Sequence, residues 1–270
     1  MHSVGVFNNY ELQRWKLSEI AWTDVDPSKV GPHDVSVVRS AVMGECNSIA
    51  ALHGFLNEFV DDYDFSAFAS LWAYEELQHH FVFRTWLERV GAPVDDLPVE
   101  STRAPYPNGI APAATLATNV ISELTVNHAY QAMAEGVGEP VLKQIATRVS
   151  GDEARHAREF MHYTRRRLAQ QPAERKVVLE TLYVYLADPT RALKHPVSVF
   201  KGALPALQDS ETIDDGLRRF EARAPERVNR LRARIFKAFA AILGVPLGSP
   251  RDVKRELRRT LARATVSHGA

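Results

Sequence analysis

The chain of 270 residues carries 33 basic and 33 acidic residues and a single cysteine, Cys46. The balanced charge argues against a dedicated nucleic-acid binder, and one cysteine excludes both a disulfide framework and a metal site built on several thiolates. No secretory signal pattern is seen, and the longest apolar stretches are too short to span a bilayer. We therefore expect a soluble, cytoplasmic protein with a sizeable core.

Helical periodicity dominates the first part of the chain, and strand signals are absent. Apolar spacing predicts one long helix over 36–60. A second helix is predicted from an N-cap at Asp64 to about Val90, closed by Gly91. A proline-rich loop is expected from there to residue 112.

Two more long helices are predicted, from about Ala113 to Glu135 and from Pro140 to about Gln170. Three further helices follow, over 173–186, over 212–243 with an interruption at Pro225, and from Asp252 onward. Four helices of roughly 35–45 Å at 1.5 Å per residue suit an elongated four-helix bundle. The sequence thus predicts an all-α protein with one domain over 1–270, a bundle core at about 34–170 and extra helices at about 173–264.

Each of the four long helices carries a glutamate, and two of them carry a Glu-x-x-His motif. The set reads Glu45, then Glu76-x-x-His79 after 31 residues, then Glu123, then Glu153-x-x-His156 after 30 residues. Residues i and i+3 share a helix face, so each motif directs a carboxylate and an imidazole the same way. Four carboxylates and two imidazoles facing inward are the ligand set of a two-metal carboxylate site in a bundle.

Two alternatives remain open at this level. A third match, Glu159-x-x-His162, lies six residues beyond Glu153. It is therefore about 240° around the helix and cannot share the site. Within the second helix, Glu75 and His80 could replace Glu76 and His79 if the register were shifted by one residue.

Two segments resemble the soluble acyl-carrier-protein desaturases of the ferritin-like di-iron carboxylate superfamily. They are "WAYEELQH" at 72–79 and "EPVLKQIATRVSGDEARH" at 139–156, and the resemblance covers about 34–170. It implies a ferritin-like bundle whose two iron ions, with Mn/Fe as an alternative pair, activate O2 to remove hydrogens from an acyl chain. By motif, the implied metal ligands are Glu45, Glu76, His79, Glu123, Glu153 and His156.

The resemblance also assigns residues around the ligands. Asp152 matches an aspartate beside a ligand histidine, which would fix that imidazole's orientation. Trp22 is either the counterpart of a tryptophan that related enzymes place on an electron route or a core residue. Where the family has a threonine after the third-helix glutamate, this chain has Val126. The flanking Thr125 and Asn127 are therefore, with Asp152, the candidate catalytic residues.

The departure at Val126 leaves several reactions open. Besides desaturation, a di-iron hydroxylase or N-oxygenase of a small molecule is an alternative, although Val149 stands where an N-oxygenase would be expected to have a further histidine. A ferritin-like iron-binding protein or ferroxidase, and a scaffold with an inactive site, are the other classes. The resemblance implies an external electron donor such as ferredoxin. It also allows an acyl carrier protein as partner and a homodimer, with no nucleic acid and no membrane span.

Overall fold

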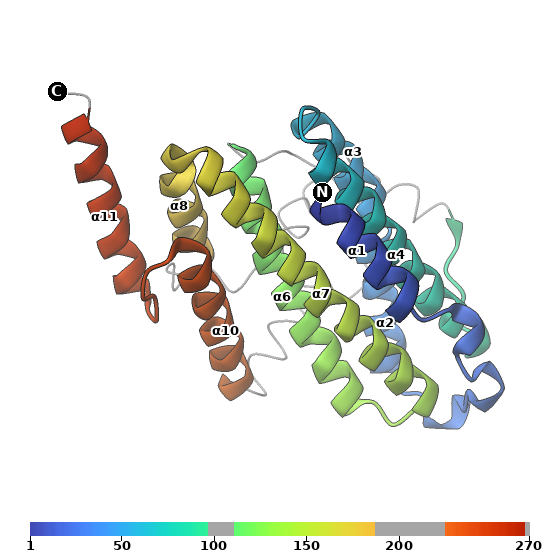
Figure 1. Cartoon of the computed structure of the whole chain (residues 1–270). Coiled ribbons are helices and arrows are strands. Elements are labelled where there is room, and N and C mark those ends of the chain that lie inside the picture. Colours follow the sequence, from blue (N-terminus) through green and yellow to red (C-terminus); the bar gives the residue numbers. More distant parts are fainter. Residues whose placement is uncertain (97–110, 187–224, 268–270) are drawn as a thin grey trace. The chain divides into compact units, whose positions relative to one another are not determined.

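The computed structural model describes residues 1–96, 111–186 and 225–267, and every regular element in these ranges is helical. No strand occurs among the described residues, which confirms the all-α prediction. The α-helices (Figure 1) are α1 (His2–Gln13), α2 (Pro32–Glu45), α3 (Ser48–Glu58), α4 (Tyr63–Arg89), α6 (Pro112–Gly136), α7 (Pro140–Gln170), α8 (Arg175–Leu186), α10 (Pro225–Leu243) and α11 (Pro250–Ser267). Short 3-10 helices lie at Leu17–Glu19, Trp22–Asp24, Pro27–Lys29 and Pro172–Glu174.

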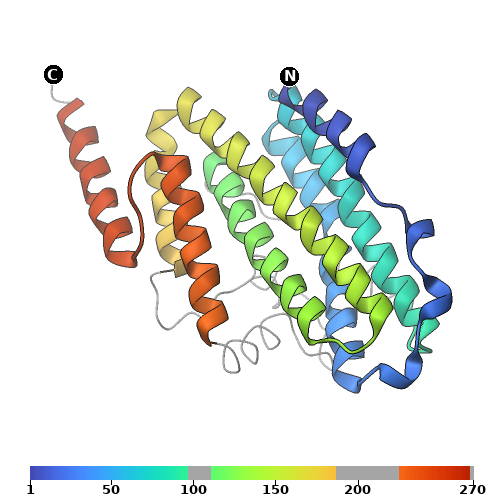
Figure 2. The same cartoon turned by 60° about the horizontal axis from the view of Figure 1, so that its bottom comes forward.

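The chain divides into two compact units. Among the described residues, the first unit holds 1–96 and 126–153, and the second holds 111–125, 154–186 and 225–267. Figure 2 shows α6 and α7 as unbroken helices, and each contributes one part to each unit. The bounds of both helices confirm the predicted third and fourth helices. A single domain over 1–270 stays a prediction.

The helix predicted over 36–60 is in fact two helices, α2 and α3, separated by Cys46 and Asn47. The Nδ2 of Asn47 donates to the carbonyl of Met43 at 2.9 Å. The backbone N–H of Asn47 donates to the carbonyl of Gly44, three residues earlier, at 3.1 Å. In a regular α-helix it would donate to the carbonyl four residues earlier. Asparagine side chains compete with backbone groups in this way. The interruption directly follows Glu45.

The start of α4 also differs from the prediction, because Asp62 and not Asp64 caps it. The side chain of Asp62 accepts a hydrogen bond from the N–H of Phe65 at 3.0 Å. Asp64 instead accepts from the backbone N–H of Ser3 at 3.0 Å and from its hydroxyl at 2.8 Å, which ties α1 to α4. Gly91 lies just past the end of the helix at φ +74°, as its predicted closing role requires.

The N-terminal helix α1 has no counterpart among the predicted elements. Its buried positions are few and include the polar Ser3, so its apolar periodicity is weak. The segment that follows α1 is fixed by Gln78 of α4, whose Nε2 donates to the carbonyl of Trp15 at 2.9 Å. Arg14 in turn donates to Oε1 of Gln78 at 3.1 Å. These bonds hold Trp15 against α4.

The hydrophobic core of the first unit is built from α2, α4, α6, α7 and the segment after α1. Its buried members are Trp15, Ile20, Val38, Val42, Val82, Phe83, Trp86, Leu87, Tyr130, Val141, Leu142, Ile145 and Val149. Full burial of one such side chain contributes roughly 1.5–3 kcal/mol to stability. This packing fixes the rotation of α4 and α7 about their axes and therefore the direction of their polar side chains.

A buried glutamate, Glu139, precedes the first residue of α7 and caps it. Its carboxyl group accepts hydrogen bonds from the N–H groups of Val141 at 3.1 Å and Leu142 at 2.7 Å. The same group accepts from Nε1 of Trp86 at 2.8 Å and from the N–H of Asp26 at 3.2 Å. One side chain thus joins the start of α7 to α4 and to the N-terminal segment.

In the second unit, α8 packs against both α10 and α11. The helix predicted over 173–186 is a 3-10 turn followed by α8, and α10 begins at Pro225, a favourable first position. Residues 212–224 of the predicted tail helix and 97–110 of the predicted loop lie outside the described residues. None of the described helices is long and apolar enough to cross a membrane.

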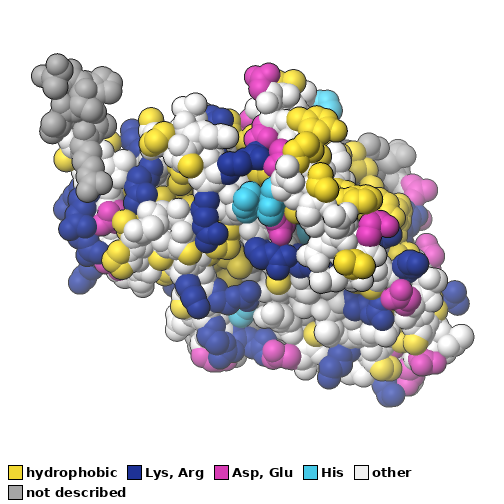
Figure 3. Space-filling model, in the orientation of Figure 1, with side chains coloured by type: hydrophobic (Ala, Val, Ile, Leu, Met, Phe, Trp, Pro, Cys, Tyr) yellow, Lys and Arg dark blue, Asp and Glu magenta, His cyan; other side chains and the backbone are white. Residues whose placement is uncertain are grey.

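The helix α11 buries one face and exposes a basic one. Val253 and Glu256 are buried, whereas the exposed positions include Arg251, Lys254, Arg255, Arg258 and Arg259. Figure 3 shows Lys and Arg side chains gathered over this helix. Two of these side chains, Arg255 and Arg259, pair with acidic residues of the same helix. Part of the basic surface is therefore neutralised within α11.

We expect Glu139→Ala to lower the free energy of unfolding by about 1.5–5 kcal/mol. The variant loses an N-cap, which is worth about 0.5–2 kcal/mol, and leaves the buried N–H of Trp86 without its acceptor, at about 1–3 kcal/mol. Urea denaturation measures the difference. The control Glu88→Ala, at a side chain with 54% exposure, should change stability by less than about 0.5 kcal/mol. Equal effects of the two variants would contradict the role of Glu139.

Candidate metal centre

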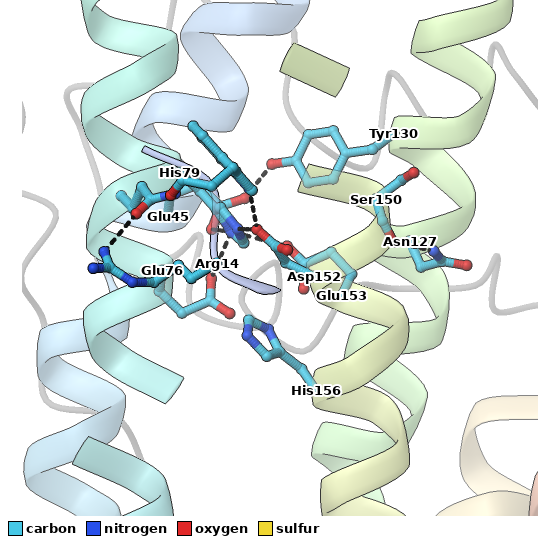
Figure 4. A network of polar contacts seen from close by, with 12 residues as sticks. Arg14, Glu45, Glu76, His79, Asn127, Tyr130, Ser150, Asp152, Glu153 and His156 are labelled. Carbon is cyan, nitrogen blue, oxygen red and sulfur yellow. Dashed lines mark hydrogen bonds and ion pairs between the residues drawn. The ribbon is translucent and has the colours of Figure 1, made fainter. Parts of the chain in front are cut away.

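Four of the six predicted ligands come together inside the first unit. Glu45 at the end of α2, Glu76 and His79 on α4, and Glu153 on α7 each offer a ligand atom, and these atoms all lie within 4.8 Å of one another. All four side chains are buried. Figure 4 shows them converging from three helices. The group therefore has the spacing and the donor types of a cation site.

The structure also settles the register within α4. His80, the alternative to His79, turns toward α2, and its Nδ1 lies 3.0 Å from the carbonyl oxygen of Val42. Glu75 is fully buried but does not belong to the ligand group. Glu76 and His79, three residues apart, are the pair that faces the other carboxylates.

His79 occupies the centre of this arrangement. Its Nδ1 lies 3.3 Å from Glu153, 3.7 Å from Glu76 and 3.9 Å from Glu45. Its other nitrogen, Nε2, lies 3.0 Å from Oδ2 of Asp152. A carboxylate behind a histidine fixes the ring orientation and the tautomer, so that the opposite nitrogen points toward the ligand position. Nδ1 is thus the atom of His79 that faces the ligand group.

A tryptophan completes this hydrogen-bonded chain, and it is Trp15. Trp22, for which the sequence left an electron-route role and a core role open, is partly buried and packs against the core of the first unit. The Nε1 of Trp15 donates to Oδ2 of Asp152 at 2.7 Å. The Nε1 of Trp22 donates instead to the carbonyl of Leu17 at 2.9 Å. Sequence reasoning missed Trp15 because the pairing joins residues 137 positions apart. Trp15 lies between Arg14 and Lys16 in a segment with weak apolar periodicity, so no sequence pattern indicated that its side chain would be buried.

Sequence reasoning also missed a tyrosine that contacts the ligand group. The hydroxyl of Tyr130, on α6, donates to Oε1 of Glu45. Its ring stacks on Phe83 of α4, with centroids 5.3 Å apart. Tyr130 follows Glu123 by seven residues, two helical turns, and this spacing could have suggested a shared face.

The buried carboxyl groups alter one another's ionisation. Burial, followed by the negative charges of Glu76 and Glu153, raises the pKa of the Glu45 carboxyl well above its usual range. Burial by itself would lower the pKa of His79, but hydrogen bonds with Asp152, Glu153 and Glu76 outweigh it and raise that pKa well above its usual value. The group therefore holds protons that an entering cation would displace, so cation affinity should fall as the pH falls.

The remaining two predicted ligands, Glu123 and His156, form a buried pair in the second unit. Oε2 of Glu123 lies 3.5 Å from Nδ1 of His156. On α7, His156 follows Glu153 by three residues, so both side chains project from the same side of one helix. The pair therefore has the donor types expected of a second ligand set.

The predicted catalytic residues Thr125 and Asn127 are engaged elsewhere. The hydroxyl of Thr125 donates to the carbonyl of Ile121, one turn back on α6, at 2.7 Å. The Nδ2 of Asn127 donates to the carbonyl of Ser150 at 2.5 Å, and Figure 4 shows its side chain turned toward Ser150. Asp152 contacts the ligand group through Nε2 of His79.

Carboxylate oxygens combined with imidazole nitrogen favour iron and manganese over metals that prefer thiolates. Three carboxylates and one imidazole within reach of a single ion fit that donor set, and the residues present are compatible with such a metal. A comparison with models of protein families finds no match, and no curated protein is significantly similar to the chain in sequence. The proposed function therefore rests on the geometry of the ligand group.

We expect Glu153→Ala to lose at least one metal ion per chain, because Glu153 supplies an oxygen of the buried ligand group. Elemental analysis of the purified variant after metal loading measures this. Glu159→Ala is the matched control. It removes a buried glutamate of the same helix, one that belongs to no candidate ligand group among the described residues. Full occupancy in Glu153→Ala would refute the assignment.

Proposed function

We propose that the chain is a ferritin-like di-iron carboxylate oxidoreductase that activates O2 to oxidise or desaturate an acyl-like or other apolar organic substrate. The observation that carries the proposal is the buried group of Glu45, Glu76, Glu153 and His79. In this proposal α2 with α3, α4, α6 and α7 form the four helices of the bundle. The resemblance of 72–79 and 139–156 to acyl-carrier-protein desaturases selects this chemistry among ferritin-like proteins.

Two ions are proposed, held by the six ligands that the repeated motif identifies. The first ion would be held by the group around His79. The second would be held by Glu123 and His156 of the second unit. Support comes from the pairing of Glu123 with His156 and from the position of His156 one turn beyond Glu153. Four carboxylates would balance the four positive charges of two divalent ions.

When bound, the ions would supply the redox chemistry that reduces O2. Desaturation removes two hydrogen atoms from the substrate and, with two electrons and two protons from a donor, converts O2 to two water molecules. The side chains around the site hold it in place and exclude water. Asp152 orients His79, and Tyr130, whose ring stacks on Phe83, donates a hydrogen bond to Glu45.

The proposal is tested by loading the protein with Fe²⁺ and measuring O2 consumption. We expect consumption that requires ferredoxin, its reductase and NADPH, and that increases when an acyl substrate is added. Mass spectrometry should find a product that has lost two hydrogens or gained an oxygen atom from O2. Glu76→Ala should abolish this turnover. Consumption that only follows the amount of added Fe²⁺, without reductant, would identify a ferroxidase instead.

The contact of Trp15 with Asp152 suggests the path by which electrons reach the site. We expect Trp15→Phe to slow reduction of the loaded protein by reduced ferredoxin at least about tenfold, equal to about 1.4 kcal/mol in activation free energy. Stopped-flow absorbance measures the rate, and metal content measured in parallel shows that the site is intact. Trp22→Phe is the matched control and should keep the parent's rate. Equal rates for both variants would exclude Trp15 from the path.

A further inference from the structure

Tyr130 stands out as a polar side chain of the hydrophobic core that touches a predicted ligand. Its side chain is buried, and its ring is stacked on Phe83 with an angle of 25° between the ring planes. Packing of this kind restricts an aromatic side chain to a narrow range of positions. The position of its hydroxyl group is therefore fixed by the core of the first unit.

That hydroxyl distinguishes the two oxygens of Glu45. Oε1 accepts the hydrogen bond from Tyr130, whereas Oε2 is the oxygen that lies 3.9 Å from Nδ1 of His79. Figure 4 shows the tyrosine reaching the carboxylate from α6, a different helix from those that carry Glu45 and His79. One oxygen is thus occupied, and the other faces the ligand group.

The backbone around Glu45 explains why such a contact would matter. Glu45 is the last residue of α2, and the regular hydrogen-bond pattern is interrupted at Asn47. Glu76 lies in the middle of α4, where the backbone is held on both sides. A ligand at a helix end, such as Glu45, is less restrained by its backbone. A fixed hydrogen-bond donor on a neighbouring helix supplies the missing restraint.

We propose that Tyr130 is a positioning residue that makes Glu45 a one-oxygen ligand. By holding Oε1, the phenol directs Oε2 alone toward the metal. This inference rests on the proposed function, since it requires a metal in the group. It assigns to Tyr130 no direct contact with the metal or with the substrate.

The test uses Co²⁺ as a spectroscopic probe of the purified, metal-free protein and of its Tyr130→Phe variant. We expect the variant to bind Co²⁺ about 10–100-fold more weakly, because an orienting partner of a ligand is lost. We also expect its visible absorption bands to weaken, because the freed Oε1 can add to the coordination of the metal. Tyr10→Phe, which removes another buried phenol of the first unit, should match the parent in both measurements.

The outcomes separate this inference from the proposed function. A parent protein that binds no Co²⁺ contradicts the metal centre itself and this inference with it. A parent that binds, with a Tyr130→Phe variant of equal affinity and identical spectrum, overturns the positioning role alone. Weaker binding with an unchanged spectrum also overturns it, because a general loss of packing would give that result. Weaker binding with altered bands establishes it.

Discussion

Carboxyl groups cannot remain ionised in an apolar core without a compensating positive charge, and the first unit is organised around that constraint. Glu45, Glu76 and Glu153 are buried together with His79 between α2, α4 and α7. The pKa of Glu45 is raised because burial and its acidic neighbours oppose ionisation. A helical core that served only for packing would place apolar side chains at these positions, which would be more stable there. The buried acids and His79 together form a group that could hold a cation.

The constraint extends outward from the ligands through hydrogen bonds. His79 is oriented by Asp152, and Asp152 also accepts from Trp15. Trp15 is held in turn by Gln78 and by its place in the core. The N-terminal segment thus supports the site through its hydrogen bonds with Gln78 of α4 and Asp152 of α7. Such outer contacts tune a metal site nearly as strongly as the ligands themselves.

Helix ends contribute to the geometry of the site as much as helix faces do. α7 begins at a cap formed by Glu139, which also binds Trp86 of α4. This contact fixes the position of α7 along its axis relative to α4, and with it the height at which Glu153 meets His79. At the other end of the group, α2 stops at Glu45, where a side-chain contact from Asn47 interrupts the helix. Local capping and a local break therefore set the position of two ligands.

Much of this arrangement was readable from the sequence because it depends on local spacing. Residues three apart share a helix face whatever surrounds them, so the pairs Glu76 with His79 and Glu153 with His156 were predictable, as were the bounds of α6 and α7. Proline and glycine at their ends mark those helices by their own backbone preferences. The all-α class follows from the same periodicity.

The tertiary structure determined the contacts between residues that are far apart in the chain. The orientation of His80 away from the ligand group depends on Val42, and the position of the Trp15 side chain depends on Asp152. Neither partner is visible in a local pattern, because hydrogen bonds between helices depend on how the helices pack. The interruption between α2 and α3 after Glu45 could not be predicted for a related reason. Asparagine is only mildly unfavourable inside a helix, and whether it interrupts one depends on where its side chain bonds.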